Sequence, residues 1–264
     1  MVDIAPVLDA LRAQRPLVQN ITNFVVMNFS ANALLAMGAS PAMVHAVDEV
    51  EDFVAISASL VVNIGTLDAG WAQSMRLAAA KADALGKPWV LDPVGVGATR
   101  FRQQTCADLM RHRPSIIRGN AAEIMTLAGA QGGRSRGVDS LANSADAIDA
   151  AQHLARATGC VAVASGEADI VTDGERVATI RGGAEMITLI TGTGCSLSAA
   201  TAAMAAVAPD RFVAAVAACA LFKVAAERAA AKAGAPGTLA ARFLDALYGV
   251  DAGDLAFAAS IELA

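Results

Sequence analysis

Hydrophobic positions change their spacing repeatedly along the chain, which predicts alternating strands and helices. Short apolar runs rich in β-branched residues cover 59–64, 88–92, 115–118 and 160–165. Longer segments with helical spacing lie between or beside them, at 68–85, 101–111, 121–128 and 144–157. This alternation is typical of β-α-β units around a parallel sheet. Because the strands are almost continuously apolar, we expect helices on both faces of the sheet.

The remaining segments continue this pattern, and none of them marks a domain boundary. Asp173-Gly174, flanked by residues 169–172 and 176–180, is a two-residue hairpin motif, so part of the sheet is expected to be antiparallel. After Cys195 the sequence is helical in character to about Tyr248, with breaks at Pro209 and at 234–237. Residues 131–139, rich in Gly and Arg, are expected to form a mobile surface loop. With no repeat and no linker, we expect one three-layer α/β/α domain over residues 1–264.

Composition narrows the class of protein. The 264 residues are 55% hydrophobic, which is ample for one sizeable core. The formal net charge is −5 and no basic block is present, which argues against a nucleic-acid partner. The four cysteines include no C-x-x-C pair, and the three histidines lie far from one another in the sequence. A zinc site or a disulfide framework is therefore not expected, and a reducing compartment fits better.

No segment has the character of a membrane anchor. The longest apolar stretches, 197–208 and 212–222, are shorter than the roughly 20 residues that cross a bilayer. Residues 1–16 carry charges and lack the apolar stretch of a signal peptide. The sequence therefore predicts a soluble cytoplasmic protein without a membrane partner.

A glycine-rich loop supplies the first sign of chemistry. Residues 191–196, Thr-Gly-Thr-Gly-Cys-Ser, directly precede an Ala-rich segment that is expected to be helical. The first amides of a helix lack intrahelical acceptors, and the helix dipole adds partial positive charge there, so the loop is suited to bind a phosphate. Cys195 sits at this point, where a helix N-terminus is expected to lower the pKa of a thiol. Thr193, Gly194 and Cys195 are the catalytic candidates, whereas an ordinary tight turn before a helix is the alternative interpretation.

Four predicted strands end in polar or glycine-rich residues, at 63–66, 92–97, 118–120 and 165–167. Ligands of open α/β sheets bind outside the carboxyl ends of the strands, so we expect these segments at one sheet edge. Asp92 and Glu123 together are suited to hold Mg²⁺, partly through water. Arg118 is suited to clamp a phosphate with its planar fork. The alternatives are a turn-forming Asp92, a first-turn Glu123 behind an Asn120 helix cap, and an Arg118 in a surface ion pair.

The N-terminal run over residues 19–32 is unusually rich in asparagine. Asn23, Asn28 and Asn32 recur through a stretch that is otherwise apolar and expected to be helical, which favours a small polar pocket floor. Asn20 or Thr22 is alternatively a simple helix cap. Met43, which follows Gly38 and a predicted strand entry, is either core filler or an apolar pocket wall.

These segments together resemble the hydroxyethylthiazole kinase family of thiamine salvage, a branch of the ribokinase-like superfamily. The blocks keep the family's order from about Leu17 to Ala200, and several separated motifs are far more specific than any one of them. The matching blocks are 21–32, 38–43, 63–66, 91–99, 118–124 and 191–195.

The resemblance implies a ribokinase-like fold and ATP-dependent phosphorylation of the hydroxyl of 4-methyl-5-(2-hydroxyethyl)thiazole, with Mg²⁺ near Asp92 and Glu123. It also implies a homotrimer with active sites at subunit interfaces. Most ribokinase-like relatives have Asp at the position of Cys195, while the thiazole kinases have Cys. The implied substrate contacts are Asn23, Met43, Gly65 and Gly192, and the implied ATP contacts are Arg118, Ser165 and Asn120.

Other functions stay open at this point. Another small-alcohol kinase of the same fold, or the nucleotide-dependent dehydratase that repairs hydrated NAD(P)H, is the nearest alternative, although the dehydratase keeps Asp at the position of Cys195. A dinucleotide oxidoreductase is disfavoured because Gly95-Val96-Gly97 is followed by Arg100 where the fingerprint needs Gly or Ala. A non-catalytic nucleotide sensor would need neither Cys195 nor an Asn-rich pocket.

Overall fold

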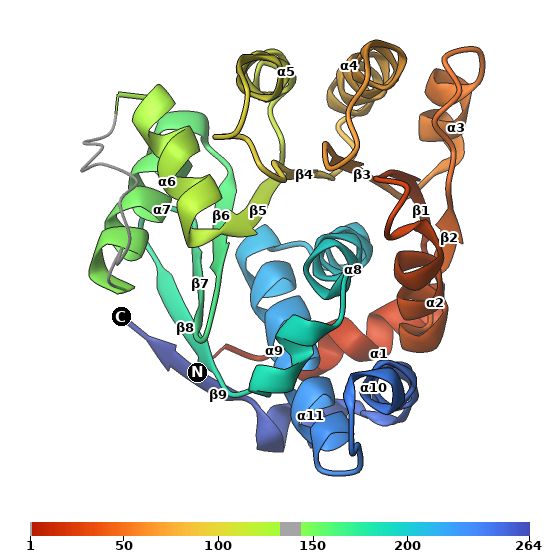
Figure 1. Cartoon of the computed structure of the whole chain (residues 1–264), viewed down its shortest axis with the longest axis vertical. Helices are drawn as coiled ribbons and strands as arrows, with labels where there is room; N and C mark the ends of the chain where they lie inside the picture. Colours follow the sequence, from red (N-terminus) through yellow and green to blue (C-terminus); the bar gives the residue numbers. More distant parts are fainter. Residues whose placement is uncertain (1, 133–143) are drawn as a thin grey trace.

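A single mixed sheet organises the chain (Figure 1). The computed structural model describes residues 2–132 and 144–264. Within these ranges the sheet has nine strands in the order β2-β1-β3-β4-β5-β6-β7-β8-β9. The strands are β1 (Leu17–Ile21), β2 (Ser40–Ala42), β3 (Ser59–Asn63), β4 (Trp89–Asp92), β5 (Ile116–Asn120), β6 (Val161–Ser165), β7 (Asp169–Thr172), β8 (Val177–Arg181) and β9 (Ser260–Leu263).

Strands β1 to β6 run parallel to one another, and β7, β8 and β9 add an antiparallel extension. The predicted hairpin at Asp173-Gly174 joins β7 to β8, which confirms that prediction. Asn63 lies beside Asp92 in the register of β3 and β4, and Asn120 lies beside Ser165 in that of β5 and β6. The expected alignment of polar strand ends at one sheet edge is therefore confirmed.

Two layers of helices cover the sheet, as predicted, and give a three-layer α/β/α architecture (Figure 1). Helices α3 to α7 pack on one face, and α1, α2 and α8 to α11 pack on the other. The strands are apolar throughout because they face both layers: Val61 belongs to one core, and its neighbours Leu60 and Val62 belong to the other. The helices are α1 (Ala5–Gln14), α2 (Met27–Met37), α3 (Val50–Ile56), α4 (Ala69–Ala84), α5 (Arg100–Met110), α6 (Ala121–Ala130), α7 (Ser144–Thr158), the 3-10 helix η1 (Glu185–Leu189), α8 (Thr193–Val207), α9 (Arg211–Ala230), α10 (Pro236–Gly249) and α11 (Ala252–Ala258).

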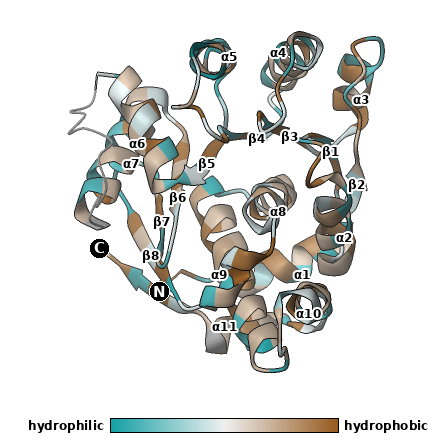
Figure 2. Cartoon of the chain, in the orientation of Figure 1, coloured by the Kyte–Doolittle hydropathy of each residue, from teal (hydrophilic) through white to brown (hydrophobic). Residues whose placement is uncertain are grey.

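Helix α8 is the central element of its layer. It contacts β1, β3 and β4 on the sheet side, and α1, α2 and α9 around its flanks. Every residue from Ser196 to Ala205 is buried. The many alanines suit this place, because small side chains allow close approach on every side of the helix. Figure 2 shows the contrast with α5, which is largely teal where α8 carries tan and brown residues. The packing directs the N-terminus of α8 toward the carboxyl edge of the sheet.

The N-terminal asparagine run is the main difference from the predicted elements. Residues 19–21 belong to strand β1, and α2 begins only at Met27, so the expected continuous helix is wrong. Val26 caps α2 without a side-chain hydrogen bond, and Asn20 Nδ2 donates instead to the carbonyl of Val18 at 2.9 Å. Neither Asn20 nor Thr22 is a helix cap.

Two further points concern the remaining segments. Strand β9 was not predicted, and it pairs antiparallel with β8 at the end of the sheet. From residue 133 onward, the loop expected over 131–139 lies outside the described residues. Among the helices that the structure describes, none combines the length and the apolar character needed to cross a membrane.

Candidate active site

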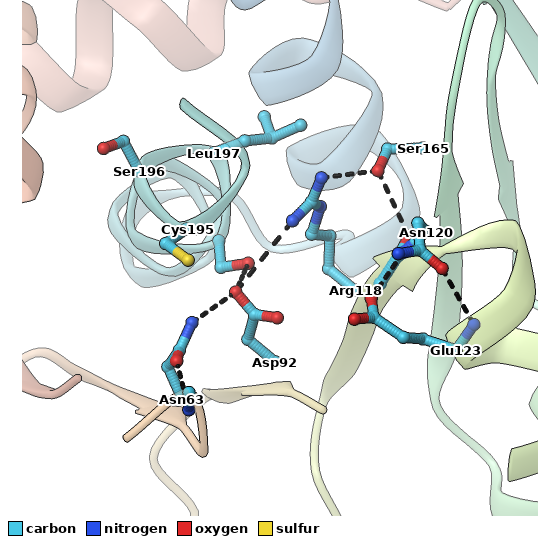
Figure 3. Close-up of polar contacts among 12 residues, drawn as sticks. Asn63, Asp92, Arg118, Asn120, Glu123, Ser165, Cys195, Ser196 and Leu197 are labelled. Atoms are coloured by element: carbon cyan, nitrogen blue, oxygen red, sulfur yellow. Dashed lines mark hydrogen bonds and ion pairs between the residues drawn. The ribbon is translucent and has the colours of Figure 1, made fainter. Parts of the chain in front are cut away.

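Polar strand ends converge on the first turn of α8 and form the candidate site (Figure 3). Asn63 closes β3, Asp92 closes β4 and Ser165 closes β6, while Arg118 lies within β5. Cys195 faces this group from the start of α8. The parallel order of β3 to β6 brings these side chains to one edge of the sheet.

Asn63 connects the two sides of the site. Its Oδ1 accepts hydrogen bonds from Asn23 Nδ2 and from the amide of Gly65, both at 2.9 Å. Its Nδ2 donates to Asp92 Oδ2 at 2.7 Å. Asn23 Nδ2 also lies 3.5 Å from Cys195 Sγ. One buried amide therefore links the predicted substrate residues Asn23 and Gly65 to the carboxylate of Asp92.

Asp92 is fully buried at the centre of the site. Its Oδ2 accepts a second hydrogen bond, from Ser198 Oγ at 2.8 Å, and Arg118 Nη1 lies 3.9 Å away. Its Oδ1 is buried and has no hydrogen-bond partner. Burial raises the pKa of Asp92 to about 6, and the nearby Arg118 opposes that rise. A turn-forming role alone does not account for a carboxylate enclosed in this way.

Arg118 is 8% exposed, which excludes the surface ion pair considered for it. Its Nη2 donates to Ser165 Oγ, which itself donates to the carbonyl of Gly119 at 3.2 Å. A Cβ atom on Gly194 would lie 3.0 Å from Arg118 Nη1. The guanidinium is thus held against the first turn of α8, between Ser165 and Asp92 (Figure 3).

Glu123 and Asn120 form a capping box at the start of α6, as the alternative interpretation expected. Asn120 Oδ1 accepts from the amide of Glu123 at 2.9 Å, and Glu123 Oε2 accepts from the amide of Asn120 at 2.8 Å. Glu123 Oε1 reaches further and accepts from the amide of Gly95 at 2.9 Å. The carboxylate lies close enough to Asp92 to raise its pKa. Glu123 therefore caps α6 and also lies beside the site.

The N-terminus of α8 offers unpaired backbone donors. Gly192 caps the helix with φ of +91°, and a Cβ there would lie 2.9 Å from Val26 Cγ1. The amide of Ser196 makes the first intrahelical bond, to the carbonyl of Gly192 at 2.8 Å. The amides of Thr193, Gly194 and Cys195 therefore have no acceptor within the helix. Together with the helix dipole they form a site for an anion.

The thiol of Cys195 is not activated by this position. Burial raises its pKa to about 11, and the negative charge of Asp92 adds to the rise. The expectation of a lowered thiol pKa at a helix N-terminus is wrong here, because desolvation outweighs the hydrogen bonds with Asn63 and Asn23 and the charge of Arg118. Cys195 is a neutral thiol near pH 7.

The other predicted substrate residues lie on the same side of the molecule. Met43 is partly buried and directly follows β2, which pairs with β1. Asn28 and Asn32 bond to each other at 3.0 Å on α2, and Asn28 is exposed, so the expected asparagine floor is wrong for these two. Asn23 is the member of that run that contacts the central network.

Two residues of this network were not singled out from the sequence. Asn63 was noted only as part of a strand end, and Ser198 was not noted at all. Ser198 lies three residues after Cys195 on the buried helix, and this spacing places both on one helix face. From the sequence, only this spacing from Cys195 indicates that Ser198 faces the site.

Comparisons with known proteins identify the family. The model of the "Hydroxyethylthiazole kinase family" matches residues 8–253. A hydroxyethylthiazole kinase of Granulibacter bethesdensis is 52% identical over 96% of this chain and 92% of its own length. One of Rhizobium etli is 50% identical over 97% of this chain and 100% of its own.

Solved structures agree. The hydroxyethylthiazole kinase protein of Pyrococcus horikoshii OT3 superposes with a TM-score of 0.93 at 39% identity, covering 100% of both chains. The pyridoxal kinase of Staphylococcus aureus, at 14% identity and a TM-score of 0.62 over 81% of this chain and 88% of its own, shares the fold alone. With the family model matched over nearly the whole chain, the protein belongs to the hydroxyethylthiazole kinase family and is a phosphotransferase with the ribokinase-like fold that the sequence predicted.

Proposed function

We propose that this chain transfers the terminal phosphoryl group of ATP to the hydroxyl of 4-methyl-5-(2-hydroxyethyl)thiazole in thiamine salvage. The observation that carries the proposal is the first turn of α8, where three free backbone amides lie beside Arg118 and Cys195. Membership of the hydroxyethylthiazole kinase family supports the choice of substrate. Phosphoryl transfer depends mainly on positioning and on neutralising charge, and this turn is built for both.

The substrate is proposed to lie on the Asn23 side of Cys195. Asn23, Gly65 and Gly192 are its proposed contacts there, and Met43 supplies an apolar wall. Asn23 Nδ2 lies 3.5 Å from Cys195 Sγ, so a hydroxyl bound at Asn23 is within reach of the thiol. A Cβ on Gly65 would lie 2.6 Å from Asn23 Nδ2, which explains why no larger side chain stands there.

The phosphates of ATP are proposed to lie on the Arg118 side. The planar fork of Arg118 lies against the first turn of α8, since a Cβ on Gly194 would lie 3.0 Å from Arg118 Nη1, and the amides of Thr193, Gly194 and Cys195 in that turn are free. Arg118 Nε is buried without a hydrogen-bond partner, so the guanidinium retains donor capacity. Ser165 and Asn120, at the adjoining ends of β6 and β5, are the further proposed ATP contacts.

Asp92 and Glu123 are proposed to hold Mg²⁺ together, with part of its shell supplied by water. Asp92 contributes a buried Oδ1 with no partner, while each oxygen of Glu123 accepts one backbone amide and keeps a free lone pair. The described residues contain no cluster of three or more His, Cys, Asp or Glu side chains able to enclose a metal alone. Mg²⁺ commonly retains several waters and shares its site with substrate phosphates. When bound, it would neutralise phosphate charge.

Cys195 is proposed to orient the substrate hydroxyl rather than to remove its proton. A thiol with a pKa of about 11 is protonated near pH 7, so little thiolate is available as a base. A loose transition state needs little help from a base, and the amides of α8 contribute more by charge stabilisation.

The whole chain is proposed to act as one domain in a cytoplasmic homotrimer. Exposed apolar side chains near the site support an interface there: Phe24, Val25 and Leu189 are 61%, 63% and 66% exposed. Phe24 and Val25 directly precede Val26, and Val26 packs against Gly192. Leu189 lies three residues before Gly192 in the sequence, so all three exposed side chains adjoin this contact. Light scattering on the purified protein is expected to give the mass of three chains, and a monomer at micromolar concentration would remove this part of the proposal.

One assay tests the proposed activity. The purified protein is incubated with Mg-ATP and the thiazole alcohol, and the phosphate monoester is sought by mass. Ribose and a hydrated nicotinamide dinucleotide serve as competing substrates in parallel reactions. The proposal expects the thiazole phosphate as the main product. Faster phosphorylation of ribose, or dehydration of the dinucleotide without thiazole phosphate, would contradict it.

A further inference from the structure

Arg102, in the first turn of α5, makes an unusual set of contacts with two separate loops. Its Nη1 donates to the carbonyl of Ile64 and to that of Val94, both at 2.6 Å. Its Nη2 donates to the carbonyl of Gly65 at 2.7 Å. One half-buried guanidinium therefore joins the loop after β3 to the loop after β4.

The two loops carry different parts of the proposed site. In the loop after β3, the amide of Gly65 donates to Asn63, and Gly65 packs directly against Asn23. In the loop after β4, the amide of Gly95 donates to Glu123 Oε1. The carbonyls that Arg102 holds belong to Ile64, to Gly65 itself and to Val94, immediately before Gly95. Arg102 thus fixes both the segment that packs against Asn23 and the segment that donates to Glu123.

Regular sheet pairing ends just before these loops. The register of β3 and β4 closes with Asn63 beside Asp92, and the amide of Ile64 makes one more bond, to the carbonyl of Asp92 at 3.3 Å. Beyond that point, no further backbone hydrogen bond joins the two loops in the described part of the chain, and Arg102 bridges them with a fork whose charge is permanent. A hydrogen bond from a charged group contributes more than a neutral one, so three such bonds fix the separation of the loops firmly.

We propose that Arg102 is a positioning residue that sets the distance between the substrate-side loop at Gly65 and the Glu123 carboxylate. The inference rests on the proposed function, because it assigns the two loops to the thiazole alcohol and to the phosphate end of ATP. Phosphoryl transfer between two bound partners requires their reacting atoms to be held within a narrow range of distance. Without Arg102, the distance between the Gly65 loop and the Glu123 carboxylate would no longer be fixed, although each loop would keep its own contacts.

The test is Arg102→Ala, with Arg100→Ala as the matched control. Arg100 is an exposed arginine in the same helical turn. We expect Arg102→Ala to lower kcat about 100-fold, as a misplacement near 1 Å does, with smaller changes in the KM values for either substrate. Arg100→Ala is expected to keep kcat within about 2-fold, as surface substitutions do. Arg102→Lys keeps the charge but lacks the fork, so its kcat should fall between those of the wild type and Arg102→Ala.

Hydrogen exchange followed by NMR gives a second measurement that needs no substrate. The amides of Gly65 and Gly95 should exchange faster in Arg102→Ala, while that of Gly174, held by Thr172 in the distant β7–β8 hairpin, should not change. Wild-type kcat in the folded variant, unchanged exchange at either loop, or an equal rise at Gly174 would each overturn the inference. If Arg102→Ala does not fold, Arg102→Lys is measured in the same way.

Failure of the proposed function is distinguishable from failure of this inference. A wild-type protein that makes no thiazole phosphate refutes the function before any variant is made. The exchange comparison then decides alone whether Arg102 sets the spacing of the two loops.

Discussion

Replacing Gly194 by alanine is expected to lower activity and to leave stability unchanged or raised. Gly194 occupies the first turn of α8 and does not require a positive φ, so its backbone accepts an L side chain. Alanine is favoured over glycine within a helix by about 1 kcal/mol. The added Cβ, however, would lie 3.0 Å from Arg118 Nη1 and 3.1 Å from Nη2.

The guanidinium has little room to yield to that Cβ. It is held by Ser165 on one side, with Asp92 at 3.9 Å on the other. Moving it by a few tenths of an ångström shifts the fork relative to Ser165 and Asp92 and misaligns a phosphate donor. Loss of one preorganised donor costs about 3 kcal/mol, or 10²- to 10³-fold in kcat, and we expect Gly194→Ala toward the lower end of this range because the fork is displaced and not removed. Gly194→Val, with a larger side chain, should nearly abolish turnover.

Steady-state kinetics with ATP as the varied substrate, together with thermal unfolding, checks this expectation. Arg118→Lys serves as the second arm of a double-mutant cycle, because a lysine lacks the fork that Gly194→Ala displaces. The combined losses should then be less than additive. Wild-type kcat and KM in Gly194→Ala, or fully additive losses in the double variant, would refute the proposed contact between Arg118 and the phosphates.

Four further predictions concern the side chains around this turn and its neighbours. Cys195→Asp should keep or improve turnover and Cys195→Ala should retain measurable activity; a dead Cys195→Asp would give the thiol another role. With a pKa of about 11, the thiol gains thiolate as pH rises toward that value, so its alkylation by iodoacetamide should keep accelerating past pH 9, and a plateau below pH 8 would contradict the burial argument. Arg118→Lys should weaken use of ATP, and unchanged kinetics with ATP would remove Arg118 from the phosphate site. Asp92→Ala and Glu123→Ala should lose turnover with thiazole binding nearly intact, whereas wild-type activity across a Mg²⁺ titration would refute the metal assignment.

The periodic pattern of the sequence was enough to predict the architecture. Strands buried on both faces leave continuous apolar runs, and short polar ends mark where such strands stop. The predicted strand ends at Asn63, Asp92 and Ser165 fall within the described β3, β4 and β6. Strand β9 escaped prediction because Ser260–Leu263 is short and carries a serine and a glutamate, and its partner β8 is distant in sequence.

The contacts within the site were harder to predict because they depend on register and burial. That Asn63 joins Asn23 to Asp92 follows from which residues lie opposite in β3 and β4, which the sequence does not specify. The pKa of Cys195 follows from desolvation, which a local rule about helix N-termini does not include. Arg102 reaches two loops that lie 8 and 38 positions away in the sequence, so no short motif identifies it.

The burial of α8 from Ser196 to Ala205 has a consequence for how the site responds to its solvent. Because residues Ser196 to Ala205 are enclosed by the sheet and neighbouring helices, water and dissolved ions have no access to most of the helix wall. Counter-ions screen a helix field mainly where the helix is exposed, and here only the first turn and the last two residues, Ala206 and Val207, are partly exposed. The field at Gly194 and Cys195 is therefore open to screening only from the first turn, which a bound phosphate would cover. Added salt would weaken the diffusional approach of the polyanionic nucleotide, while the attraction felt by a phosphate already seated at the helix end would change little.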